Sequence, residues 1–66
     1  MLYPNLKAEM SRKGITNTDV AKCIGLDPST ITAKFNIPNR IKLVECIKIK
    51  NTFFPDMSIE YLFGAR

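Results

Sequence analysis

The sequence predicts an all-α domain of five short helices, and three observations predict it. Apolar residues recur at spacings of three and four along most of the chain, which is the pattern of amphipathic helices. Glycine and proline stand where helix ends and helix starts are expected. Nowhere do apolar and polar residues alternate for long enough to indicate a strand. Because the chain has 66 residues, we expect one domain over 1–66 with a single small core.

The first two helices are expected at 4–13 and 17–24. Pro4 suits the first turn of the first helix, where its missing N–H costs nothing. Glycine ends each helix, because its αL conformation closes the last turn at Gly14 and Gly25. The second helix begins at an N-cap that resembles a capping box, formed by two residues, Thr16 and Asp19.

A third helix is expected at 28–35, because Asp27 followed by Pro28 is an N-cap with proline at the first helical position. Further helices are expected at 42–51 and at 59–63. The side chains expected to form the core, rather than to contact a ligand, are Ile31, Phe35, Leu43, Ile47 and Phe54. The exposed residues of the third helix are short and polar, which is unusual because serine and threonine are mediocre helix formers.

Composition excludes several classes of function. The chain has no histidine and two cysteines, too few ligands for a zinc site, so we expect no metal, no cofactor and two reduced thiols in a cytoplasmic protein. A chain this short leaves no room for a substrate cleft, and we see no catalytic set, so an enzyme is not expected. No apolar run is long enough to cross a membrane, and the amino-terminal segment lacks the apolar core of a signal peptide.

Positive charge is concentrated in the middle of the chain. The formal net charge is +4, and residues 34–50 hold five lysines and arginines against one glutamate. A solvated helix surface and a contact surface for a polyanion both explain such a cluster, so charge alone leaves the choice open.

The segment 16–35 carries the functional signal. Two short helices are joined by a turn that holds Gly25, whose freedom to adopt positive φ permits a tight connection. Ala21 is small enough for the two helices to cross closely, and Leu26 and Ile31 attach the pair to the core. Such a pair can project one helix rigidly outward.

Residues 5–54 resemble the DNA-binding domain of phage Cro and lambda-type repressors, the XRE-like helix-turn-helix family. The resemblance rests on Gly14-Ile15-Thr16, Ala21, Gly25, Ile31, and the run from Ile47-Lys48-Ile49-Lys50 to Phe53-Phe54-Pro55-Asp56. It implies a transcriptional regulator of phage or prophage type that resembles a repressor. In that family the second helix of the motif, here 28–35, lies in the major groove of double-stranded DNA.

The resemblance also implies which residues meet the DNA. The expected base contacts are Ser29, Thr30, Thr32 and Ala33, and the expected backbone contacts are Asn17, Lys34, Asn36, Asn39, Arg40 and Lys42. The sequence departs from the family at Pro28 and Ser29, where relatives often carry glutamine or arginine. Direct readout of bases is therefore expected to be modest, with DNA shape and phosphate contacts contributing more.

A homodimer on a palindromic operator is expected, because one small module has limited contact area. The segment 56–66 is rich in apolar residues, which either close the core or form a dimer contact. Candidate contact residues are Val44, Tyr61 and Phe63. The alternative function is a protein-interaction module, antitoxin-like or anti-repressor, that uses the same helical fold to hold a protein partner.

Overall fold

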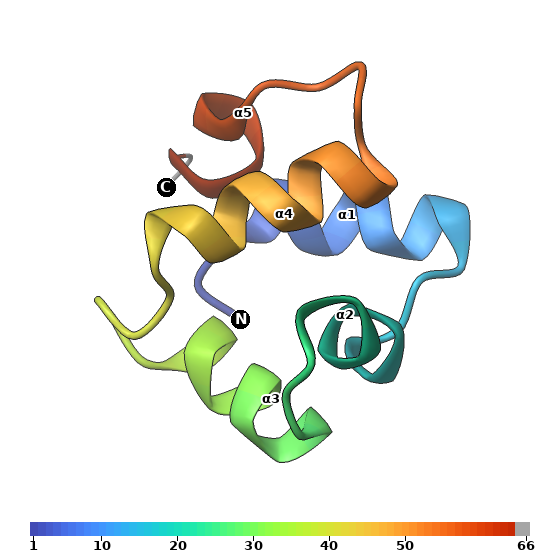
Figure 1. The fold of residues 1–66 in the computed structure, drawn as a ribbon. Helices are drawn as coiled ribbons and strands as arrows, with labels where there is room; N and C mark the ends of the chain where they lie inside the picture. Colours follow the sequence, from blue (N-terminus) through green and yellow to red (C-terminus); the bar gives the residue numbers. More distant parts are fainter. Residues whose placement is uncertain (65–66) are drawn as a thin grey trace.

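The structure, a computed structural model, describes residues 1–64, and these form five helices with no strand among them (Figure 1). The helices are α1 (Pro4–Lys13), α2 (Asn17–Ile24), α3 (Pro28–Asn36), α4 (Leu43–Phe53) and α5 (Ile59–Gly64). The predicted all-α class is confirmed, and every helix end lies within two residues of its predicted position. Ala65 and Arg66, the end of the expected closing segment, lie outside the described residues. Among the helices described, none has the length and apolarity needed to span a bilayer.

The predicted signals set the ends of α1 and α2. The Thr16 hydroxyl accepts the Asp19 N–H at 3.2 Å, and the Asp19 carboxylate accepts the Thr16 N–H at 2.9 Å, so the capping box is complete. Gly14 and Gly25 follow the two helices at φ angles of 67° and 86°, where a Cβ would be strained. The short connections that these caps create bring successive helices into contact.

One core joins all five helical segments. Its buried members are Leu6, Met10, Val20, Ala21, Ile31, Phe35, Ile49, Phe54 and Leu62. Helix α2 packs against α3 and α4, whereas α5 packs against α1 and α4. Helices α3 and α5 therefore lie at opposite ends of the molecule in Figure 1. Burial of Ile31, Phe35 and Phe54 confirms those three core predictions.

Two core predictions on α4 are wrong. Leu43 is 66% exposed and Ile47 is 39% exposed, whereas the sequence predicted that both would be buried. Helix α4 has two apolar sides that share Cys46. One side also holds Leu43 and Ile47, and the other also holds Ile49 and Phe53. The core uses the stripe that continues to Ile49 and Phe53, so periodicity along one helix did not distinguish the two sides.

A buried carboxylate ties α5 to α1. Glu9 is 4% exposed, and a buried charge is costly unless it is paired. The Tyr61 phenol donates to its Oε2 at 2.7 Å, and the Arg12 guanidinium donates to the same atom at 3.1 Å. The hydrogen bond to Glu9 raises the pKa of Tyr61. Tyr61, a candidate dimer residue from sequence, therefore also has a structural role within one chain.

Two isoleucines on α4, buried Ile49 and exposed Ile47, test which side of the helix faces the core. Ile49→Ala should lower the free energy of unfolding by about 2–5 kcal/mol, because it leaves a cavity in the core. Ile47→Ala should change it by only about 0.5 kcal/mol, as expected for a surface site. Urea denaturation measures both values. If Ile49→Ala does not fold, Ile49→Val should still lower the free energy of unfolding by about 1 kcal/mol. Equal losses of stability on substitution of Ile47 and Ile49 would contradict the observed packing.

Candidate nucleic-acid interface

Helix α3 is fixed at both ends and along its buried side. At its start the Asp27 carboxylate accepts the Ser29 N–H at 3.0 Å and also the Ser29 hydroxyl. At its end the Leu2 N–H donates to the Phe35 carbonyl at 2.8 Å, which satisfies one of the carbonyls that a helix end leaves unpaired. Ile31 and Phe35 are 0% and 1% exposed, respectively. Helix α3 is therefore held as a rigid element on the rest of the domain.

The exposed side of α3 carries short side chains. All four residues expected to contact bases are exposed, namely Ser29, Thr30, Thr32 and Ala33. Alanine, serine and threonine extend only slightly beyond the helix backbone, so a partner can approach the helix closely. The structure brings these four residues together on the surface of one helix.

Thr32 is the centre of a hydrogen-bond network that joins α3 to α2. Its hydroxyl donates to the Pro28 carbonyl at 3.1 Å and accepts from Asn17 Nδ2 at 3.2 Å. Its carbonyl accepts from Asn36 Nδ2 at 2.9 Å. A threonine hydroxyl has one proton to donate, so no donor remains for a base. Thr32 can therefore offer a partner its methyl group and one acceptor lone pair.

Lys34 points away from the exposed side of α3. Its ammonium lies 3.2 Å from the Glu45 carboxylate and donates to the Arg40 carbonyl at 3.2 Å, and its side chain is 15% exposed. This residue was expected to contact the DNA backbone, but in the structure it braces the loop between α3 and α4. Burial alone would raise the pKa of Glu45, but hydrogen bonds from the Lys42 N–H and from Lys34 hold it below its ordinary value.

Two cations remain exposed just beyond α3. Arg40 and Lys42 lie in the connection to α4, and neither has an ion pair within the described part of the chain. Asn39 in the same connection adopts a left-handed φ of 62°, a conformation that asparagine tolerates better than most residues. The structure thus places Asn36, Asn39, Arg40 and Lys42 in one exposed segment that continues from α3.

Other cations have partners in the fold. The Lys13 ammonium donates to the Phe53 carbonyl at 2.8 Å and lies over the Phe54 ring, and Lys50 donates to the Pro55 carbonyl at 3.2 Å. Both therefore stabilise the end of α4, where cations oppose the helix dipole favourably. Of the mid-chain cations, Lys34 is paired with the Glu45 carboxylate, and Lys50 donates to a backbone carbonyl.

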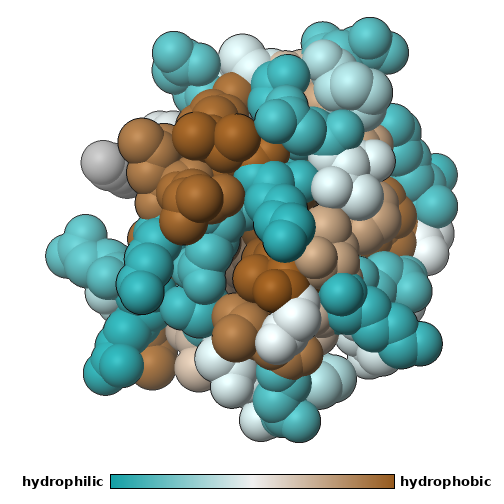
Figure 2. Space-filling model, in the orientation of Figure 1, coloured by the Kyte–Doolittle hydropathy of each residue, from teal (hydrophilic) through white to brown (hydrophobic). Residues whose placement is uncertain are grey.

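An apolar patch lies on α4 away from the core. We call Leu43, Val44 and Ile47 the α4 patch; they are 66%, 67% and 39% exposed. Figure 2 shows hydrophobic side chains gathered over the first part of α4 and the neighbouring part of α5. Next to the patch is a shallow groove lined by residues that include Leu43, Ile59 and Phe63.

The three candidate dimer residues thus differ in exposure. Val44 belongs to the α4 patch, and Tyr61 is 40% exposed but bonded to Glu9. Phe63 is half-buried and packs edge-on against Tyr3 with ring centroids 5.3 Å apart. Sequence reasoning missed Leu43 and Ile47 as surface residues because it assigned them to the core.

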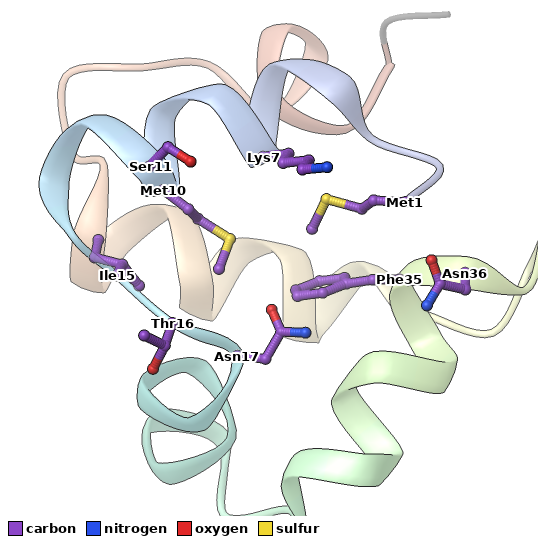
Figure 3. A pocket seen from close by; sticks show the side chains of 9 residues that line it. All are labelled: Met1, Lys7, Met10, Ser11, Ile15, Thr16, Asn17, Phe35 and Asn36. Atoms are coloured by element: carbon purple, nitrogen blue, oxygen red, sulfur yellow. The ribbon is translucent and has the colours of Figure 1, made fainter.

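A second feature that sequence reasoning missed is a pocket of about 200 Å³ beside α3 (Figure 3). It is lined by Met1, Lys7, Met10, Ser11, Ile15, Thr16, Asn17, Phe35 and Asn36. These residues come from three separate parts of the chain, so no local pattern could have indicated the pocket. The sequence pattern indicated no functional role for Lys7 or Ser11.

The described residues contain no group of three or more metal-ligating side chains. Both cysteines are free: Cys46 is buried, and half-buried Cys23 donates to the Thr52 hydroxyl at 3.3 Å. Burial raises the pKa of the Cys46 thiol, so it stays protonated and behaves as a small hydrophobic residue.

Comparison of the chain with family models, with curated proteins and with solved structures found no match. The function must therefore be inferred from the chemistry of the surface around α3.

The lowered pKa of Glu45 predicts a specific pH dependence of stability. A carboxylate whose pKa is lower in the folded state stabilises the fold above its unfolded pKa, about 4.3, and loses this contribution as pH falls through the folded pKa. Glu45→Gln should therefore be less stable than the parent chain at pH 7, and the difference should disappear below both pKa values. Urea denaturation across this pH range measures it.

Glu60→Gln is the matched control, because Glu60 is exposed and forms no ion pair with any described residue. It should lower the free energy of unfolding at pH 7 by less than Glu45→Gln does. A Glu45→Gln chain as stable as the parent at pH 7 would show that the ion pair between Lys34 and Glu45 contributes nothing to the stability of the fold.

Proposed function

We propose that the chain is a sequence-specific, double-stranded-DNA-binding transcriptional regulator, repressor-like and of phage or prophage type. In this proposal α2 and α3 form a helix-turn-helix, and α3 is the recognition helix in the major groove. The observation that carries the proposal is a rigidly held helix whose exposed side chains are all short, followed directly by exposed Arg40 and Lys42.

The dimensions and chemistry of α3 support this function. The major groove of B-DNA admits one α-helix and displays base edges with distinct donors, acceptors and thymine methyl groups. Short side chains such as Thr30 and Ala33 let the helix come close to those edges. Because the only proton of the Thr32 hydroxyl is used within the protein, its expected role is methyl contact rather than donation to a base.

The cations beyond α3 supply the second part of the interaction. Phosphate contacts give most of the affinity and fix the register of a protein on DNA, whereas base contacts give specificity. Arg40 and Lys42 take the phosphate role in this proposal, together with Asn36 and Asn39. Lys34 acts indirectly, because it holds the connection that carries them.

We further propose that a homodimer reads a palindromic operator through two copies of α3. The α4 patch supports this, since contiguous exposed apolar side chains are typical of protein contact sites. The patch begins at Leu43, directly after Lys42, which is the last residue of the exposed segment that follows α3. Pairing through it would link two DNA-reading units and double the contact area.

Two substitutions separate affinity from specificity. Arg40→Ala should weaken binding to every duplex alike and reduce the slope of log K against log salt by about 0.9, because one phosphate contact is lost. Thr32→Ala should instead change the ranking of duplexes that differ in sequence. Fluorescence anisotropy on a panel of duplexes at several salt concentrations measures both effects.

Lys22→Ala serves as the control, since Lys22 is an exposed cation on α2 that belongs neither to the expected DNA contacts nor to the α4 patch. It should leave the slope and the ranking unchanged. Binding that shows neither salt dependence nor sequence preference in the parent chain would refute the proposed function.

The dimer is tested by a charge placed in the α4 patch. Val44→Glu should shift the chain towards monomer and reduce its preference for a palindrome over a single half-site, because the carboxylate must lose water on pairing. Sedimentation velocity and anisotropy measure these results. Asn51→Glu adds the same charge on α4 about 10 Å further along its axis and should change neither. If Val44→Glu leaves both measurements unchanged, the patch is not the dimer contact.

The alternative function, a protein-interaction module, is favoured by two specific observations. Asp27 places a carboxylate at the start of α3, where it would repel a phosphate, while the α4 patch offers apolar surface for a protein. In that case a bound protein partner should survive nuclease treatment during purification. A complex that dissociates with nuclease supports the DNA-binding proposal instead.

A further inference from the structure

The outward side of α3 has few side chains that can donate a hydrogen bond. With 3.6 residues per turn, Ser29 and Ala33 lie opposite the buried side of the helix, and Thr30 and Thr32 lie on its two flanks. None of the four is an arginine, lysine, asparagine or glutamine, the residues that make paired hydrogen bonds to guanine or adenine. Donation to a base from this side of α3 therefore depends on three hydroxyl groups.

The Ser29 hydroxyl gives its proton to Asp27. The two side chains are hydrogen-bonded, and the Asp27 carboxylate also accepts the Ser29 N–H at 3.0 Å. The hydroxyl bond first, and the N–H bond second, lower the pKa of Asp27, so the carboxylate is ionised at neutral pH and can only accept. The proton between the two side chains therefore belongs to Ser29, and this residue offers a partner an oxygen lone pair.

The Thr32 hydroxyl is also occupied within the protein. It donates to the Pro28 carbonyl at 3.1 Å and accepts from Asn17 Nδ2 at 3.2 Å. Of the three hydroxyls, only that of Thr30 has no hydrogen-bond partner among residues 1–64. The outward side of α3 therefore presents one free donor, whereas Thr30, Thr32 and Ala33 present three methyl groups.

One feature of the major groove is complementary to methyl groups. Thymine carries a methyl group at C5 that projects into this groove, and alanine and threonine methyl groups make apolar contact with it. Guanine shows two acceptors there, N7 and O6, which the lone pairs of Ser29 would repel. The hydrogen-bonding state of α3 thus favours contact with a C5 methyl group over contact with guanine.

We propose that α3 recognises C5 methyl groups in the major groove, and that 5-methylcytosine replaces thymine at the positions that α3 meets. The inference rests on the proposed function and adds which part of the base is read. Cytosine has a hydrogen atom at C5, and its methylation places a methyl group where thymine has one. Methylation of cytosine at these positions therefore increases the affinity of the chain for the duplex.

The test begins with the duplex that the chain selects from a random pool. Each thymine is replaced in turn by uracil, which keeps the base pair and removes only the C5 methyl group. At positions that α3 meets, this loss should weaken binding about fourfold per methyl group, the contribution of one buried carbon group. Uracil outside the half-sites should have no effect. Fluorescence anisotropy measures each dissociation constant.

Cytosine at the sensitive positions gives a second comparison. A C·G pair in place of T·A should weaken binding, because it removes the methyl group and changes the other groups on the base edges. Replacing that cytosine by 5-methylcytosine should recover about fourfold in affinity, since the two duplexes differ only by the methyl group.

Three variants test whether α3 makes the methyl contacts. Thr30→Ser, Thr32→Ser and Ala33→Gly each remove one methyl group, and the two serine variants keep the hydroxyl. Each should move the ratio of affinities for thymine and uracil towards one at a single position. Thr30→Val is the matched control, because it removes the free hydroxyl but keeps the methyl group, and it should leave the ratio unchanged. Circular dichroism confirms that each variant remains folded.

The outcomes separate this inference from the proposed function. A chain that selects no common sequence contradicts the proposed function and the inference together. A selected duplex whose affinity is the same with uracil as with thymine overturns the inference and leaves DNA binding by α3 intact. A loss with uracil that is unchanged in all three methyl-removing variants reflects the shape of the DNA and also overturns it. A loss with uracil that 5-methylcytosine reverses and that the variants abolish supports the inference.

Discussion

Burial of Ile31 and Phe35 is the constraint on which the rest of the structure depends. These two side chains are spaced one helical turn apart, and both are almost completely removed from solvent. They fix the rotation of α3 about its own axis, because the side of the helix that carries them must face the core. The remaining residues of α3 are then forced outward, where they are available to a partner. The exposure of the short side chains is therefore a consequence of how the core orients α3.

Polar contacts convert this orientation into a fixed position. Asp27 holds the start of α3, Thr32 connects its middle to α2, and Lys34 connects its end to α4 through Glu45. The sequence predicts the N-cap role of Asp27, whereas it assigns Thr32 and Lys34 to DNA contacts. In this small domain the same polar residues have to stabilise the fold and shape its contact surface. This explains why Lys34 is withdrawn from the surface while Arg40 and Lys42 remain there.

The sequence was sufficient for the helices and for the side of α3 that is buried. Local signals such as the capping box at Thr16 and glycine at positive φ act within a few residues, so they can be read in order along the chain. The sequence was insufficient for α4, because its two apolar stripes share Cys46 and only tertiary packing selects the one through Ile49. The pocket around Lys7 could not be predicted either, since its walls come from distant segments. Side-chain pairing such as Lys34 with Glu45 also requires the fold to be known.

The central claim is that the outward side of α3 reads double-stranded DNA. Selection of bound duplexes from a random pool tests it most directly. The account predicts enrichment of a palindromic motif whose half-sites are about one helical turn apart. Recovery of duplexes with no common sequence, or of no duplex at all, would contradict it.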